Sequence, residues 1–371
     1  MTFAVVAPGD RAPGFTAASP SNPQFRFDSV AGRWLVLFFA GSLRDPAGAA
    51  ALRAVEAAED VFDDARAALF TVTLDPEDEA AGRLVQKLPG RRLFRDFDGA
   101  VSRLYGSVRE DARPGSGALE VRRFWVVIDP GLTVRAVIPF AAGGADVAEL
   151  LALLRAAPPA GRHLGLPVPP PVLVLPQVLE PELCDRMTAL YEAQGGRESG
   201  FMRDRDGKTV QVLDPAFKQR RDVEIPTDDP LRAQIQARIL RRIVPEIERV
   251  HFFKVTRMER WIVSCYDSAE GGHFAPHRDN TTMGTAHRRY AVSINLNDDF
   301  DGGEVSFPEY APQGFKAPTG GAVIFSCSLL HAVSQVTRGR RFAFLPFLYD
   351  DAAAAIRERN AAAVAGGAYR A

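Results

Sequence analysis

The chain has 371 residues, which is longer than most single domains and predicts two domains, each large enough to bury a core. Lysine and arginine together number 45 and aspartate and glutamate 46, so the net charge is close to zero. This balance argues against a polyanion-binding surface, and we expect no nucleic acid among the partners.

The first part of the chain, residues 1–157, shows the alternation of strands and helices that is typical of an α/β fold. Its strongest signal is a continuous apolar strand over 33–41, because an apolar run without alternation indicates burial on both faces of a sheet. The other expected elements are a helix over 46–62, a strand over 68–74, a helix over 77–87, a β-hairpin over 124–138 and a helix over 145–155.

This order of elements resembles a thioredoxin fold. Three sequence motifs resemble those of peroxiredoxins, and the resemblance covers about residues 5–157. They are Pro8-Gly-Asp-x-Ala-Pro-x-Phe, Leu37-Phe-Phe and Phe124-Trp-Val-Val-Ile-Asp. In that family a nucleophilic cysteine stands at the start of the helix after the Phe-Phe strand, where the helix N-terminus and an arginine lower its pKa. Here Gly48 takes the slot of the nucleophile and no cysteine precedes position 184.

We therefore expect a non-catalytic first domain that acts as a scaffold, presents substrate or, as the favoured role, forms a homodimer. Arg122 or Arg123 resembles the arginine that supports the missing cysteine, although a solvated charge at the strand edge is the favoured interpretation.

A proline-rich stretch over 158–171 predicts a stiff, extended linker, with His163 as a solvated loop residue. The second domain, residues 172–371, is expected to begin with a strand over 172–176 and a helix over 180–191, followed later by a helix over 229–244. Between these helices lies a polar, irregular segment over 201–223 that could cover a site. Its basic residues Lys218, Arg220 and Arg221 could contact an acidic substrate, but a solvated basic loop is the favoured interpretation.

The chemistry of the second domain is expected to centre on His277-x-Asp279. Two residues apart on a strand, these side chains leave the same face of the pleat. His331 is a candidate third ligand, and His273 is the main rival to His277. Two histidines and one carboxylate leave the opposite metal positions open, as in non-haem Fe(II) oxygenases. The tripeptide alone would more simply be a solvated surface turn.

Ten residues beyond His331 stands Arg341, and an arginine can bind a distant carboxylate through two hydrogen bonds. Between the two histidine segments, the stretch from Tyr290 to Pro308 contains Gly302-Gly303 and predicts a hairpin of an antiparallel sheet.

Residues 172–349 resemble the prolyl-4-hydroxylase-like branch of the 2-oxoglutarate- and Fe(II)-dependent dioxygenases, whose fold is a double-stranded β-helix (jelly roll) with flanking helices. The matching pieces are Tyr266, Gly271-Gly272, His277-x-Asp279, the segment from Leu296 to Glu304, His331 and Gly339-x-Arg341. The resemblance implies that His277, Asp279 and His331 hold Fe(II) and that Arg341 pairs with the far carboxylate of 2-oxoglutarate. It also implies that Tyr266 donates a hydrogen bond in the same pocket, and that Asn295 stands where some relatives carry a tyrosine facing the cosubstrate.

The reaction that this resemblance implies is hydroxylation of a C–H bond, coupled to decarboxylation of 2-oxoglutarate to succinate. The cofactors would be Fe(II), 2-oxoglutarate and dioxygen, and the expectation extends to ascorbate. A prolyl residue of a peptide, a free amino acid and a small metabolite all stay open as substrates. The alternative is a non-catalytic protein that binds iron or 2-oxoglutarate as a sensor or interaction partner.

The cellular setting is expected to be the cytoplasm. Cys184, Cys265 and Cys327 are widely spaced, which favours free thiols in a reducing compartment. No signal-peptide pattern opens the chain, and no apolar stretch is long enough to span a bilayer, so we expect no membrane contact.

Overall fold

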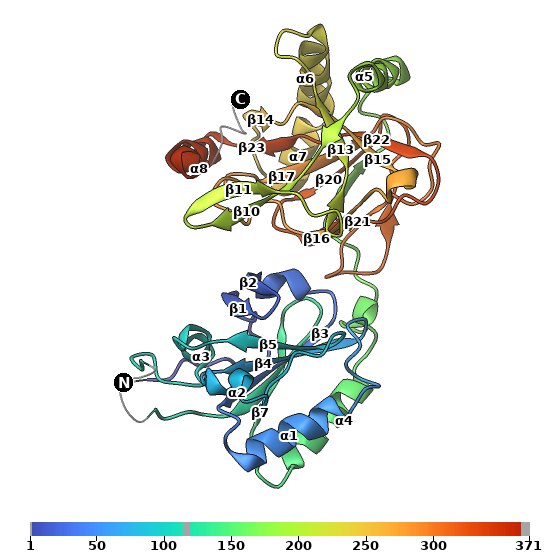
Figure 1. Ribbon diagram of the computed structural model, residues 1–371. Helices are drawn as coiled ribbons and strands as arrows, with labels where there is room; N and C mark the ends of the chain where they lie inside the picture. The colour runs from blue at the N-terminus through green and yellow to red at the C-terminus, as the bar shows by residue number, and fades with distance from the viewer. Residues whose placement is uncertain (1, 114–118, 365–371) are drawn as a thin grey trace. The chain divides into compact units, whose positions relative to one another are not determined.

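The computed structural model describes residues 2–113 and 119–364 (Figure 1). Two compact units emerge from it. The first comprises the chain up to Pro170 together with the loop Pro308–Pro312, and the second comprises Pro171–Phe307 and the chain from Gln313 onward. Each unit is described by itself below.

The first unit is built on a seven-stranded sheet in the order β2-β1-β5-β4-β3-β6-β7. Strands β3, β4 and β5 are parallel, whereas β6 runs antiparallel to β3 and β7 antiparallel to β6. The strands are β1 (Thr16–Ser19), β2 (Asn22–Arg26), β3 (Trp34–Gly41), β4 (Ala67–Thr73), β5 (Arg91–Arg95), β6 (Phe124–Ile128) and β7 (Val134–Pro139). The helices are α1 (Pro46–Glu56), α2 (Glu77–Ala80), α3 (Ala100–Tyr105) and α4 (Ala145–Ala156).

The core of this unit follows from the apolar strand β3, all eight residues of which are buried. Helices α1 and α4 pack against one face of the sheet through Leu52, Val55, Leu150 and Leu154. Phe38 on that face stacks on the indole of Trp125 from β6, with ring centroids 3.7 Å apart. The unit has the thioredoxin-like fold that the sequence predicts.

Three details of the first unit differ from expectation. The helix expected over 77–87 ends at Ala80, because Gly82 adopts a left-handed φ of 67° that breaks the helix. The helix expected over 46–62 ends at Glu56. His163 is buried rather than solvated, and its Nδ1 lies 2.9 Å from the carbonyl oxygen of Ala160.

Within the described residues, the second unit contains two antiparallel sheets, a hairpin and four α-helices. Its strands are β8 (Leu173–Leu175), β9 (Arg197–Glu198), β10 (Phe201–Arg205), β11 (Lys208–Val212), β12 (Lys218–Gln219), β13 (Arg221–Glu224), β14 (Arg257–Glu259), β15 (Ile262–Asp267), β16 (His273–His277), β17 (Tyr290–Asn295), β18 (Val305–Ser306), β19 (Gly314–Phe315), β20 (Ala322–Ser326), β21 (His331–Val333), β22 (Arg340–Phe344) and β23 (Phe347–Tyr349). Its helices are α5 (Pro181–Gln194), α6 (Pro230–Arg242), α7 (Val244–His251) and α8 (Asp351–Asn360).

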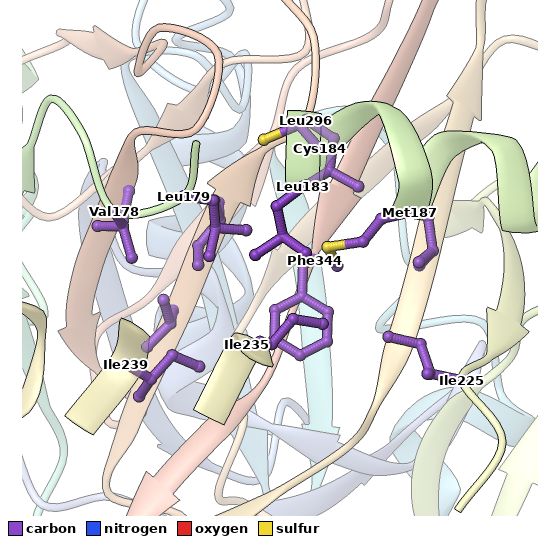
Figure 2. Close-up of a cluster of buried hydrophobic side chains, with 14 of the residues drawn as sticks. Val178, Leu179, Leu183, Cys184, Met187, Ile225, Ile235, Ile239, Leu296 and Phe344 are labelled. Atoms are coloured by element: carbon purple, nitrogen blue, oxygen red, sulfur yellow. The ribbon is translucent and has the colours of Figure 1, made fainter. Parts of the chain in front are cut away.

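The two sheets form the jelly roll that the sequence predicts. The larger one runs β14-β23-β17-β22-β15-β13-β9, and β20 and β8 extend it from β17. The smaller one runs β12-β16-β21-β18-β19 and carries both histidine segments on adjacent strands. Helices α5 and α6 cover the outer face of the larger sheet, where Leu183, Met187 and Ile235 pack near Phe344 (Figure 2). The core therefore supports the larger sheet from outside and leaves its inner face toward the smaller sheet.

The hairpin expected around Gly302-Gly303 is wrong, because the strands on either side of these glycines belong to different sheets. Strand β17 pairs with β20, β22 and β23, whereas β18 pairs with β19 and β21. Gly302 has φ of 72°, and a Cβ there would lie 2.0 Å from the carbonyl oxygen of Gln335. The Gly-Gly turn is thus a crossing between the two layers, where the backbone passes too close to its neighbour for any side chain.

Candidate metal centre

Three potential ligands converge at one edge of the smaller sheet. His277 ends β16 and lies opposite His331, the first residue of β21, in the antiparallel register. Asp279 follows two residues later, where its amide donates to the carbonyl of Cys327 over 3.0 Å. His277 Nε2 lies 3.5 Å from Asp279 Oδ1, and His331 Nε2 lies 3.3 Å from Asp279 Oδ2. One ligand atom from each residue lies within 4.8 Å of the other two.

The backbone selects which nitrogen of each imidazole faces the centre. His277 Nδ1 lies 2.8 Å from the carbonyl oxygen of Ala275, and His331 Nδ1 lies 3.0 Å from that of Leu329. Because a carbonyl oxygen can only accept, each Nδ1 carries the proton and each Nε2 keeps its lone pair. A carbonyl partner of this kind is the usual support of a metal-binding histidine.

The electrostatics also suit a cation. Burial, with a smaller contribution from the neighbouring His277, lowers the pKa of His331 to about 4, so the ring is neutral near pH 7. Burial alone would raise the pKa of Asp279, but the two histidines hold it below its ordinary value. Two neutral imidazoles and one ionised carboxylate fit a divalent iron ion, since this donor set leaves open positions for other ligands.

Arg341 lies on β22 of the larger sheet and is 1 % exposed. Its Nε donates to Asn295 Oδ1 over 3.0 Å and its Nη2 donates to Ser293 Oγ over 2.7 Å. Its Nη1 has no hydrogen-bond partner among the residues that the structure describes. Asn295 therefore holds the arginine and also donates from its Nδ2 to the carbonyl of Ala317 over 2.7 Å, and its part in cosubstrate binding stays a prediction. Ser293, which the sequence reading did not single out, acts in the same way, two residues before Asn295 on the same face of β17.

Tyr266 lies beside this arginine and connects it to a second one. It is the cross-strand neighbour of Arg341, whose guanidinium carbon lies 5.2 Å from the centre of the phenol ring. The Tyr266 hydroxyl oxygen accepts a hydrogen bond from Nη1 of Arg220 over 3.3 Å. The hydroxyl proton of Tyr266 is left to donate elsewhere.

The rival ligand His273 is turned away from the ligand cluster. Its Nδ1 lies 2.8 Å from the carbonyl oxygen of Gly271 and its Nε2 lies 3.2 Å from that of Ala216. Both ring nitrogens thus face backbone oxygens. On a regular strand, a spacing of four residues would place His273 and His277 on the same face. The register of β16 is irregular between Phe274 and His277, so this expectation does not apply here.

The preference for a solvated loop at Lys218, Arg220 and Arg221 is wrong for two of the three. Lys218 and Arg220 are each 4 % exposed, whereas Arg221 lies at the surface and pairs with Glu270 over 3.3 Å. Strands β12 and β13 form here and turn alternate side chains inward. Residues 218–221 are all polar, so the sequence carried no apolar alternation that could have signalled this burial.

In the first unit, the slot of the missing nucleophile faces an arginine. A Cβ built on Gly48 would lie 3.2 Å from Nη1 of Arg123. Arg123 pairs with Asp45, the residue that caps α1 by accepting a hydrogen bond from the Gly48 amide over 3.0 Å. Arg122 instead lies over the ring of Phe3. Arg123, rather than Arg122, therefore faces this slot, and it is paired with Asp45 rather than being a lone solvated charge.

A His-Asp-His cluster inside a jelly roll is the arrangement of non-haem iron oxygenases. Residues 261–349 match the model of the 2OG-Fe(II) oxygenase superfamily, and residues 8–137 match that of the AhpC/TSA family. These matches confirm both resemblances drawn from the sequence. The first family implies Fe(II), 2-oxoglutarate and dioxygen as cofactors.

Individual relatives match part of this chain, and the chain spans less than two thirds of the length of the first of them. The PKHD-type hydroxylase PiuC of Pseudomonas aeruginosa is 29% identical over 147 residues, which cover 37% of this chain and 64% of PiuC. A PKHD-type hydroxylase of Paracoccus denitrificans is 29% identical over 185 residues, covering 46% of this chain and 75% of the relative. A solved prolyl hydroxylase from Trichoplax adhaerens, in complex with a hypoxia inducible factor peptide fragment, aligns with a TM-score of 0.41 at 16% identity over 50% of this chain and 86% of that one.

No helix in the described part of the chain combines the length and the apolar character that crossing a bilayer requires.

Proposed function

We propose that the second unit is an Fe(II)- and 2-oxoglutarate-dependent dioxygenase that hydroxylates a C–H bond while 2-oxoglutarate is decarboxylated to succinate. The observation that carries the proposal is the meeting of His277, Asp279 and His331 within 4.8 Å, although 52 residues separate Asp279 from His331 in the chain. The family match over residues 261–349 and the hydroxylase names of the relatives support it.

The ligand residues would hold the iron and leave positions for the cosubstrate and dioxygen. Bound Fe(II) would supply the redox chemistry that activates dioxygen, which no protein side chain provides. His277 and His331 contribute Nε2 lone pairs because their Nδ1 protons are committed to backbone carbonyls. Asp279 contributes its carboxylate, which its amide contact to Cys327 keeps in place.

The cosubstrate would be oriented by Arg341 and Tyr266. The partnerless Nη1 of Arg341 is a buried donor that a carboxylate would satisfy, and burial makes such a charge-assisted bond strong. Tyr266 would donate its hydroxyl proton to the same carboxylate. Apolar side chains of Phe274, Phe300 and Val333 pack around Tyr266 and would exclude water from the cosubstrate.

Two further parts of the proposal concern partners. We include ascorbate as the reductant that keeps the metal ferrous between turnovers. We also propose that the first unit serves as a scaffold and forms a homodimer, because it keeps the peroxiredoxin fold and lacks the nucleophile.

The test is an assay of the purified full-length protein with Fe(II), 2-oxoglutarate and ascorbate in air, with and without added cell extract. We expect succinate in both mixtures and, with extract, a product heavier by one oxygen atom in mass spectra. Binding of 2-oxoglutarate without any succinate would contradict the proposal and favour the sensor alternative.

A further inference from the structure

A buried basic cluster lies beside the candidate metal centre and is not needed to bind 2-oxoglutarate. It consists of Lys218 and Arg220, which approach the site from the segment that carries β12 and β13. Both side chains are almost completely buried. Asp222 is the carboxylate of this cluster, and it accepts a hydrogen bond from Nη2 of Arg220 over 2.7 Å.

Lys218 lies beside a side chain that contacts one of the candidate metal ligands. In the register of β12 and β16 it stands opposite Phe274, and its Nζ lies 5.0 Å from the centre of the Phe274 ring. That ring stacks on the imidazole of His277, with ring centroids 3.5 Å apart. A group held by Lys218 would therefore lie close to the ligand side chains.

Arg220 connects the cluster to the cosubstrate end of the site. It contacts the Tyr266 hydroxyl, and its positive charge is close enough to Arg341 to lower the pKa of that guanidinium, after burial as the larger cause. Its Nε is buried without a hydrogen-bond partner among the residues that the structure describes. Arg220 thus keeps one donor unused.

Bound 2-oxoglutarate would not supply a negative charge to this cluster, because its charge would be used at the metal centre. A divalent metal ion, the Asp279 carboxylate, the Arg341 guanidinium and the 2-oxoglutarate dianion would cancel one another. Lys218 and Arg220 then have Asp222 as their carboxylate, and Asp222 is shared with Arg260 at 3.4 Å. A buried basic group without a matching anion is costly to keep charged, so one more negative group would stabilise the charged form of this cluster.

The hydrogen bonds that Lys218 makes do not require an amine at this position. Its Nζ donates to Ser199 Oγ over 2.8 Å and to the carbonyl of Gly200 over 2.6 Å, and a neutral amide could make both bonds. An ammonium has three donors, and the described residues supply no third oxygen acceptor to Lys218. Burial and the neighbouring Arg220 lower the pKa of Lys218, while Asp222 and Asp279 oppose that shift. An anion next to Lys218 would favour the charged form.

We infer that the substrate of this site is a small carboxylic acid whose carboxylate is bound by Lys218, with Arg220 as a second positive charge. The inference rests on the proposed function and narrows its substrate class. It favours a free amino acid or another small acid over a prolyl residue inside a peptide, because the two basic side chains are buried and an internal residue brings no carboxylate of its own.

The experiment measures binding of propionate and its amide to the full-length protein loaded with Mn(II) and saturated with 2-oxoglutarate. Mn(II) is paramagnetic and speeds the relaxation of nearby protons, so the relaxation rate of the methyl protons reports binding beside the metal. We expect saturable enhancement for propionate and none for propionamide. Enhancement of the 2-oxoglutarate protons in the same sample shows that the metal and the cosubstrate are in place.

A variant and a matched control then test Lys218 itself. Lys218→Gln keeps a donor for Ser199 and Gly200 and removes the charge, and we expect propionate affinity to fall about tenfold or more. Lys208→Gln makes the same change at an exposed position on β11 and should leave the affinity unchanged.

The outcomes separate the inference from the proposed function. Equal enhancement for acid and amide in the wild type would overturn the inference without any variant. So would wild-type propionate affinity in Lys218→Gln, because the carboxylate would then bind the metal alone. Absence of enhancement for 2-oxoglutarate would overturn the proposed function and the inference together.

Discussion

At the scale of single residues, backbone carbonyls fix the orientation of the histidine rings in the candidate metal centre. The carbonyls of Ala275 and Leu329 fix the tautomers of His277 and His331, and each carbonyl lies two residues before its histidine. Because the tautomers and ring orientations are already fixed, metal binding would not require the rings to reorient. The three ligand side chains are thus arranged for a cation by their own local backbone.

The buried arginine of β22 gives the first prediction. Arg341→Met removes the donor proposed for the far carboxylate, so the KM for 2-oxoglutarate should rise about 10- to 100-fold, with a smaller effect on kcat. Arg340→Met is the matched control, since Arg340 points to the opposite face and pairs with Glu192 over 2.6 Å. Succinate formation at varied 2-oxoglutarate measures both. Equal KM values in the two variants would contradict the assignment.

Sequence patterns were informative for the ligands and less so for the residues that support them. His277-x-Asp279, His331 and Arg341 stand out because their types and spacing are rare in combination. Ser293 and Asn295, which hold Arg341, are ordinary polar residues on a strand, and their role depends on which strand lies beside β22. Pairing between strands far apart in the chain cannot be read from local patterns.

At the scale of elements, apolar runs predicted several strands of the first unit, whereas the burial of charged segments was not predicted. Strand β3 and the pair β6 and β7 were expected from their apolar residues. Strand β5 was not predicted, because three of its five residues are arginines. Two of these arginines form ion pairs, one with Asp64 and one with Glu79. The same difficulty hid the burial of Lys218 and Arg220. Ion pairs formed by distant residues make a polar sequence compatible with a buried strand.

Strand β14 carries a buried carboxylate that predicts a pH-dependent stability. Burial would raise the pKa of Glu259, but Arg288 and His287 outweigh it and lower the pKa to about 2 from the ordinary value of 4.5. Because the folded pKa lies below the unfolded one, the contribution is complete above about pH 4.5 and is lost as pH falls toward 2. Its full size is about 3 kcal/mol.

Urea unfolding at several pH values measures this contribution. Glu259→Gln should lower the free energy of unfolding at pH 7 and lose most of that difference by about pH 3. Glu224→Gln, at a side chain that is 72% exposed, should show little difference at either pH. A Glu259→Gln deficit that did not shrink in acid would show that packing, not charge, is lost.

The backbone just before α5 passes close to Gly320, and this close approach leads to a second prediction about stability. Gly320 has φ of 75°, and a Cβ there would lie 2.2 Å from the carbonyl oxygen of Leu179. Gly207 has a similar φ of 74° but open space around it. Gly207→Ala should cost about 1–2 kcal/mol of unfolding free energy for the backbone alone. Gly320→Ala should cost about 1–3 kcal/mol more because the backbone must shift, and equal costs would contradict the close approach.

At the scale of the whole molecule, the chain combines one unit that has the peroxiredoxin-like fold without its nucleophile and one that carries a complete set of candidate metal ligands. All three cysteines lie in the second unit and are buried. Burial raises the pKa of Cys184 and of Cys265 to about 12, so neither is a thiolate near neutral pH. The molecule therefore offers no activated thiol in the unit that resembles peroxiredoxins.

The absence of a cysteine from the first unit predicts that the full-length protein does not reduce peroxide at the expense of a thiol. With a metal chelator present to suppress iron chemistry, consumption of hydrogen peroxide with dithiothreitol should equal that of the mixture without protein. A rate that rose with protein concentration and vanished after alkylation of the cysteines would contradict the loss of peroxidase function.

The most direct measurement of the central claim is the iron content of three proteins reconstituted with Fe(II) under argon and then separated from free metal. Wild type and His273→Ala should each retain one equivalent, because His273 faces backbone carbonyls and not the ligand cluster. His277→Ala, changed at the other end of the same strand, should retain almost none. Retention of a full equivalent by His277→Ala, or its loss in His273→Ala, would contradict the account.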